Sequence, residues 1–272
     1  MKKKAKSLSN IYLPVNTIMF QFNTRLFSNF VAGCACLILI TLSTAPLAQA
    51  ARGGGGGSGE MQFGIIAGVS QTTQDGMNLL ATRANARTGV GPVSTGALNS
   101  AYEFGIQYGY RFSGSMFSLL FRPTYFMETT TGSGTGGSYN YGVTGFTFFP
   151  ILRLVPLENE FMKFFLNLGL GYGQASSKIE EGRAQVSATG SAFGTLVGLG
   201  AEFCMTPVHC ISLEGNYRYL TMDRNIASDA SGTFASDSIS QATTNREVEL
   251  DGDDLKVRMG GLQFLAGYII HF

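Results

Sequence analysis

Two histidines and two cysteines are the residues best suited to chemistry in the part of the chain that follows residue 50. His209 and His271 are the only histidines, and Cys204 and Cys210 are separated by five residues. A hydrolase would need a histidine beside a serine or an aspartate. The cysteine spacing exceeds the roughly two to four residues of a zinc pair, and the sequence has no second pair of metal ligands to complete a site. We therefore expect no metal site.

The two cysteines leave two interpretations open. Exported proteins commonly oxidise their cysteines, and a short hairpin would place Cys204 opposite Cys210 at bridging distance. The alternative is two small buried residues that do not react.

The elements that carry these residues have a period of two. Residues 101–112 (AYEFGIQYGYRF) place Tyr102, Phe104 and Ile106 on one face and Glu103 and Gly105 on the other. Alternation of this kind predicts a strand whose two faces meet different media.

The same alternation recurs along the chain and predicts eight strands. Around Gly145 the alternation slips, which indicates a β-bulge. Long polar connections (72–100, 130–138, 176–191 and 222–255) alternate with short ones (113–116, 156–160 and 205–209). The expected strands are residues 61–69, 101–112, 117–129, 139–155, 164–174, 192–204, 210–221 and 261–272.

This pattern predicts an all-β fold, namely an eight-stranded antiparallel up-and-down transmembrane β-barrel. Lipid offers no hydrogen bonds, so a sheet exposed to lipid must close on itself. In a soluble barrel or sandwich the outward face would be rich in charge, whereas only 14% of this chain is charged and its second face is glycine, glutamine, serine and asparagine. Many glycines suit a narrow interior.

The first fifty residues predict export. Basic residues precede an apolar run, Phe30–Leu42, and the small-residue site Ala48–Ala50 follows. We expect residues 1–50 to be a signal peptide, 51–60 a glycine-rich linker and 61–272 the barrel, placed in the outer membrane of a Gram-negative bacterium. An uncleaved anchor is the alternative for the apolar run, and Met19 is an alternative start.

The end of the chain, LAGYIIHF (265–272), carries a resemblance to a known group. It resembles the last strand of small outer-membrane barrels of the OmpA-barrel, OmpX and OmpW kind, which ends in an aromatic residue. The resemblance implies that Gly267, Tyr268, Ile270 and Phe272 form the signal read by the outer-membrane assembly machinery. In the implied topology both histidines fall at the periplasmic end, away from the outer rim, so we expect no catalysis and no catalytic residues.

Several charged residues point inward by parity. Charges removed from water need partners, so we expect Arg122 to pair with Glu214 or Glu202 across the lumen and to plug it. A transport gate is the alternative. The expected inward charges are Glu103, Arg111, Arg122, Glu128, Glu202, Glu214 and Arg218.

The remaining features favour a non-enzymatic surface protein. The acidic run 247–254 is a solvated loop or, alternatively, a cation site. All 18 acidic residues lie after residue 50, which gives no reason to expect nucleic acid as a partner. We expect a monomer without cofactors, in contact with outer-membrane lipid and lipopolysaccharide, with a structural or surface-interaction role. The alternative is a narrow channel for small or apolar solutes.

Overall fold

The computed structural model describes residues 59–87, 93–134, 136–234, 239 and 242–272. The expected signal peptide and nearly all of the expected linker lie outside these residues. The barrel begins at Glu60, one residue before its predicted start.

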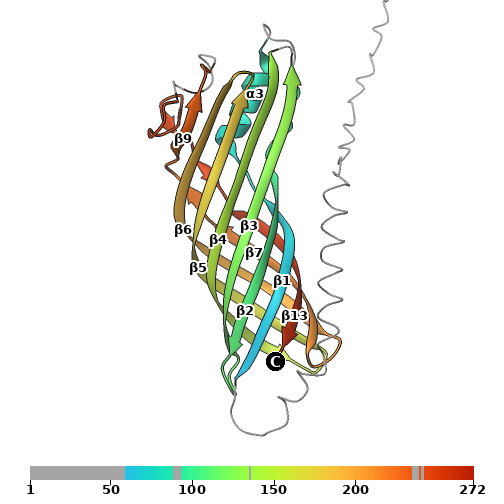
Figure 1. The fold of residues 1–272 in the computed structure, drawn as a ribbon. Coiled ribbons are helices and arrows are strands. Elements are labelled where there is room, and N and C mark those ends of the chain that lie inside the picture. The colour runs from blue at the N-terminus through green and yellow to red at the C-terminus, as the bar shows by residue number, and fades with distance from the viewer. Residues whose placement is uncertain (1–58, 88–92, 135, 235–238, 240–241) are drawn as a thin grey trace, which may run out of the picture. The chain divides into compact units, whose positions relative to one another are not determined.

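Eight long strands form a closed antiparallel ring (Figure 1). Each of the eight strands pairs with the next one along the chain, and this includes β5 with β6. The ring closes where the first strand pairs with the last, from Gln62 opposite His271 to Gln71 opposite Leu262. The strands are β1 (Glu60–Gln71), β2 (Ser100–Arg111), β3 (Phe117–Gly134), β4 (Gly137–Glu158), β5 (Met162–Glu181), β6 (Ala184–Cys204), β7 (His209–Tyr219) and β13 (Gly261–His271).

The middle strands are longer than their apolar alternation predicted. β3 and β4 continue to a pairing of Gly134 with Gly137, and β5 and β6 continue to a pairing of Glu181 with Ala184. The prediction of long loops at 130–138 and 176–191 was therefore wrong. Ser, Thr and Gly in these segments form strands, and the turns that join them are tight.

Along these long strands the side chains keep their alternation between the two faces, but the apolar residues move from the outward face to the inward face part of the way along. In β5, Leu168 and Leu170 point outward, but farther along the same face carries Ser176 and Lys178, while Ile179 is buried inside. β4 changes in the same way at Gly145, which pairs in regular register with its neighbours. The bulge predicted there was wrong, and the register shift of β4 lies between Leu154 and Leu157. The pattern slips because the medium outside the sheet changes from lipid to water.

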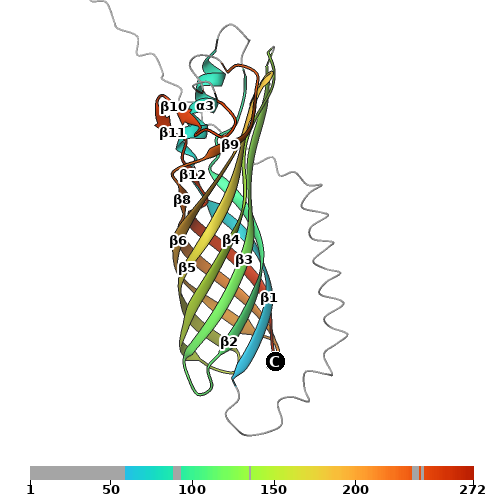
Figure 2. The ribbon, with the colours of Figure 1, turned by 60° about the vertical axis from the view of Figure 1, so that its left-hand side comes forward.

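A helix and several short strands cover one end of the ring (Figure 2). Helix α3 (Asp75–Ala86) buries Met77 and Leu80 in an apolar cluster that continues down into the barrel. We call this region the cap. Its short strands are β8 (Thr221–Met222), β9 (Ile226–Ser231), β10 (Glu249–Leu250), β11 (Asp253–Asp254) and β12 (Val257–Arg258).

The outside of the ring is an apolar band. Phe193 is 84% exposed and Leu170 69% exposed, values that water-facing side chains of this kind rarely show in contiguous sets. Such a surface on a closed ring is suited to hydrocarbon. Within the described residues, no helix has the length and apolar character needed to cross a membrane.

Candidate functional site

The lumen holds a cluster of buried charged side chains that surround the carboxylate of Glu214. Glu214 of β7 accepts hydrogen bonds from Nη2 of Arg122 at 2.8 Å and from Nη2 of Arg153 at 2.7 Å. Nη1 of Arg122 lies 2.8 Å from the other carboxylate oxygen. All three side chains are at most 3% exposed. Two cations thus share one anion at the centre of the barrel.

Neutral amides supply the remaining partners of this cluster. Gln107 accepts a hydrogen bond from Nε of Arg122 at 3.2 Å, and Asn167 accepts one from Nε of Arg153 at 3.0 Å. Asn167 and Asn216 both donate to Glu214, at 3.2 and 3.3 Å. This many partners is what an ion cluster needs when it is removed from water.

A second ion pair lies closer to the cap. Arg218 donates two hydrogen bonds to the carboxylate of Glu103, at 3.0 and 2.8 Å, and a third to the carbonyl oxygen of Met259 at 2.6 Å. Gln263 donates to both oxygens of Glu103, at 2.8 and 2.9 Å, and the hydroxyl of Ser70 also contacts this carboxylate. Glu128, higher in the barrel, accepts hydrogen bonds from Thr72 and Gln74.

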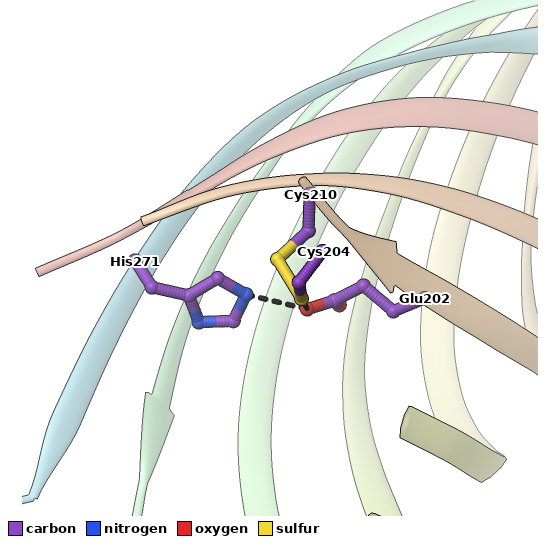
Figure 3. Close-up of side chains that lie close together, drawn as sticks. All are labelled: Glu202, Cys204, Cys210 and His271. Atoms are coloured by element: carbon purple, nitrogen blue, oxygen red, sulfur yellow. Dashed lines mark hydrogen bonds and ion pairs between the residues drawn. A yellow bond between two sulfur atoms is a disulfide. The ribbon is translucent and has the colours of Figure 1, made fainter. Parts of the chain in front are cut away.

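At the opposite end, where the short turns lie, charges meet a disulfide (Figure 3). Cys204 and Cys210 are directly paired across β6 and β7 and are joined as a disulfide, with their Cα atoms 4.0 Å apart. Nε2 of His271 lies 2.5 Å from Glu202, and Nδ1 of the same ring lies 2.9 Å from Glu60.

Of the residues expected to point inward, the structure brings Arg122 to Glu214 and Arg218 to Glu103. Glu202 instead contacts His271, with Arg153 at 3.7 Å, and Arg111 pairs with Glu158 at the short-turn rim. Sequence reasoning did not name Arg153, Asn167 or His271 as partners of these charges, although alternation places Asn167 and His271 on the inward face. Arg153 follows the same parity, so counting from the outward Leu152 would have found it.

The residues of the expected assembly signal lie at the end of β13. The hydroxyl oxygen of Tyr268 and Nδ1 of His209 are hydrogen-bonded at 2.7 Å, and Phe272 is exposed. A Cβ at Gly267 would come within 2.9 Å of the side chain of Ile66. Gly267, Tyr268 and Ile270 stand on the strand that closes the ring, and Phe272 follows its last residue.

Two acids of the acidic run near the cap, Glu247 and Asp251, contact arginines. Glu247 pairs with Arg224, and Asp251 accepts a hydrogen bond at 2.9 Å from Arg83 of α3. This hydrogen bond lowers the pKa of Asp251 below its usual value. Glu249–Leu250 and Asp253–Asp254 pair as the small hairpin of β10 and β11.

A groove of about 580 Å³ opens beside the lumen, between the last residues of β7 and the first of β13. Its lining residues include Tyr217, Tyr219, Lys256, Arg258 and Leu262. Arg218 also lines the groove, and its guanidinium is the one held by Glu103.

A closed ring of eight antiparallel strands, apolar outside and ionic inside, defines a small up-and-down transmembrane β-barrel. This class is established by strand pairing and by the distribution of side chains between the two faces of the wall.

Three solved structures, two of them named as an outer membrane protein and a surface protein, are similar to the chain. OprG from Pseudomonas aeruginosa has a TM-score of 0.49 at 13% identity, covering 80% of this chain and 98% of its own. Neisserial surface protein A has a TM-score of 0.41 at 14% identity, and the match covers 80% of this chain and 100% of that protein. Ail of Yersinia pestis, in complex with the heparin analogue sucrose octasulfate, has a TM-score of 0.37 at 16% identity. This match covers 78% of the present chain and 99% of Ail. No protein-family model and no curated protein matches the chain.

Proposed function

We propose that this chain is a closed outer-membrane barrel with a structural or surface-interaction role, exerted through the region beyond the membrane. The observation that carries the proposal is the double ionic filling of the lumen. Glu214 with its two arginines lies at one level and the Arg218–Glu103 pair at another. An eight-stranded barrel has an interior that side chains just fill, so paired charges at two levels leave no continuous aqueous path.

The cap supports the same proposal. Met77 and Leu80 of α3 are fully buried, in a cluster that includes Tyr141, Met222 and Met259. A solute entering from this side would have to displace a packed apolar core before it reached the ionic levels.

The outer ends of β3 to β6 supply the surface for interaction. Their outward face changes from apolar to hydroxyl, amide and charged groups such as Ser176, Lys178 and Glu180. A rigid polar sheet that projects from a bilayer suits contact with lipopolysaccharide or with molecules outside the cell. In this role the residues 1–50 serve as the export signal, the end of β13 serves in assembly, and no catalysis takes place.

Conductance in planar bilayers tests the closed lumen. The purified chain, inserted as a folded barrel, should give no steady current steps. Steady steps of one size would overturn the proposal. Loss of the chain from cells should at the same time increase sensitivity to detergents, if the barrel contributes to membrane integrity.

A second candidate function is passage of small apolar solutes, which the groove at Tyr217 and Leu262 favours. Its lining includes Tyr217, Tyr219 and Leu262 of the apolar band and the backbone neighbour Arg218. Solute uptake into vesicles that depends on the groove, without ionic conductance, would support this candidate over the closed barrel.

A further inference from the structure

The short-turn end of the barrel gathers four side chains that are common metal ligands. Glu202 and Cys204 come from β6, Cys210 from β7 and His271 from β13, and all four are buried. One potential ligand atom from each lies within 4.8 Å of all the others. Figure 3 shows the imidazole and the carboxylate directed at the disulfide from two sides.

We propose that this cluster becomes a zinc site when its disulfide is reduced, with Cys204, Cys210, His271 and Glu202 as the four ligands. A dithiol reductant supplies two electrons and two protons. The S–S bond of the protein breaks, the two cysteines become thiols, and the reductant closes its own disulfide. Zn²⁺ then displaces both thiol protons as it binds, and the neutral imidazole of His271 carries its single proton on Nδ1, toward Glu60, so that Nε2 is free to coordinate.

The geometry of the cluster suits tetrahedral zinc. Zinc binds thiolate at about 2.3 Å and imidazole or carboxylate at about 2.0 to 2.2 Å, which places neighbouring ligand atoms roughly 3 to 4 Å apart. The sulfur of Cys204 is 3.8 Å from Oε1 of Glu202. The two sulfurs must separate after reduction, and Nε2 of His271 must move away from Glu202, which is now 2.5 Å away. These changes are side-chain rotations at the ends of paired strands.

The second nitrogen of the histidine strengthens the assignment. Nδ1 of His271 lies 2.9 Å from Oε1 of Glu60 on β1. Metal-binding histidines usually donate the proton of their other nitrogen to a carboxylate, which fixes the tautomer and the orientation of the ring. Glu60 is therefore near enough to accept that proton after a small rotation of its side chain.

Charge also balances in the proposed state. Two thiolates add two negative charges to the cluster and Zn²⁺ adds two positive ones. The charges around it, including Arg153 at 3.7 Å and Lys163 at 4.0 Å from Glu202, need no rearrangement. A buried site that keeps its net charge avoids the main cost of bringing an ion out of water.

A small cavity reaches two of the four proposed ligands, Glu202 and His271. It has a volume of about 20 Å³, which is room for one water molecule or ion, and Glu60, Glu202 and His271 are among the residues that line it. It lies at the short-turn end, on the side away from the cap.

Cobalt substitution tests the proposal. The full chain with Cys34→Ser and Cys36→Ser is refolded in detergent, reduced with dithiothreitol, freed of reductant without oxygen and titrated with Co²⁺. We expect one Co²⁺ per chain, with thiolate-to-metal charge-transfer bands and the visible bands of tetrahedral cobalt, both displaced by Zn²⁺. The oxidised chain should give neither. Absence of charge-transfer bands from a reduced, folded barrel would overturn the proposal.

Single substitutions test the ligand set. His271→Ala and Glu202→Gln should each weaken Zn²⁺ binding about 10-fold or more, as measured by competition with a chromogenic chelator. His209→Ala is the matched control, because His209 lies at the same end but contacts Tyr268, and it should leave the affinity unchanged. An unchanged affinity in His271→Ala would show that the thiols bind metal without the site proposed.

Reduction itself can loosen the end of the barrel, so folding is followed on heat-modifiability gels. If the reduced chain loses its folded migration, Zn²⁺ should restore it, and His271→Ala should prevent the restoration. Failure of Zn²⁺ to restore folding would count against the site.

Discussion

Arg122 and Glu214 meet across the lumen from opposite walls of the barrel, with Nη1 of the arginine 2.8 Å from Oε2 of the glutamate. β3 and β7, which carry them, are four positions apart in the ring of eight. Arg153 of β4 shares the same carboxylate, so one anion joins three strands through the interior. The cluster therefore links opposite walls of the barrel and also fills its interior.

Glu214→Ala should destabilise the barrel strongly. It leaves Arg122 and Arg153 as two buried cations that repel each other, and removal of one partner from a buried ion pair costs about 3 to 5 kcal/mol. Urea unfolding in detergent measures the change in the free energy of unfolding. It is monitored by tyrosine fluorescence, since the chain has no tryptophan, and by gel migration.

Glu158→Gln is the control for this measurement. Glu158 pairs with Arg111 at 2.6 Å, but both side chains are partly exposed at the rim, where such pairs contribute about 1 kcal/mol or less. Equal losses in the two variants would contradict a special role for the lumen cluster.

A pair of arginine substitutions on β5 locates the edge of the lipid. Leu168 is 59% exposed in the middle of the apolar band, and a cation there should cost about 2 to 4 kcal/mol. Ser176 lies on the same face of the same strand, in the polar part that already contains Lys178. Leu168→Arg should therefore reduce the yield and stability of folded barrel, and Ser176→Arg should not. Similar behaviour of both variants would place the boundary elsewhere.

The change of medium also explains which parts of the fold could be predicted. Alternation predicted all eight strands and the inward position of Arg122, Glu214 and Arg218, because the period of two holds wherever lipid and lumen lie on opposite sides. It failed above Gly145, where outward residues become polar and a strand has the composition of a loop. The contact of His271 with Glu202 could not be predicted, because it depends on the register between strands distant in sequence.

Acid should loosen the attachment of α3 to the hairpin of β10 and β11. The hydrogen bond from Arg83 lowers the pKa of Asp251 below its usual value of 3.8. A carboxylate with a lowered pKa contributes stability above that usual value and loses it as the pH falls through the lower, folded-state pKa. Hydrogen exchange of α3 amides should hence accelerate below about pH 4, relative to the intrinsic rate.

Arg83→Gln isolates the contribution of Asp251. Asp75 of α3 also pairs with Arg258, at 2.8 Å, and both proteins keep this pair. The difference between the two proteins at each pH therefore reports the Arg83 contact, and it should vanish at the acid end of the titration. A difference that persists there would mean that Arg83 acts through packing.

Substitutions in α3 separate the cap from the lumen cluster as the element that closes the barrel. Leu80 is fully buried in the cap, and Leu79 beside it is 41% exposed. Leu80→Asp places an unpaired carboxylate in an apolar core and should undock α3, seen as new protease cleavage within 75–86. Leu79→Asp, the matched control, should leave the helix protected. Because the charges at Glu214 and Glu103 remain paired below, Leu80→Asp should still give no current in planar bilayers. Steady current from an undocked but folded barrel would show that the cap alone closes the lumen.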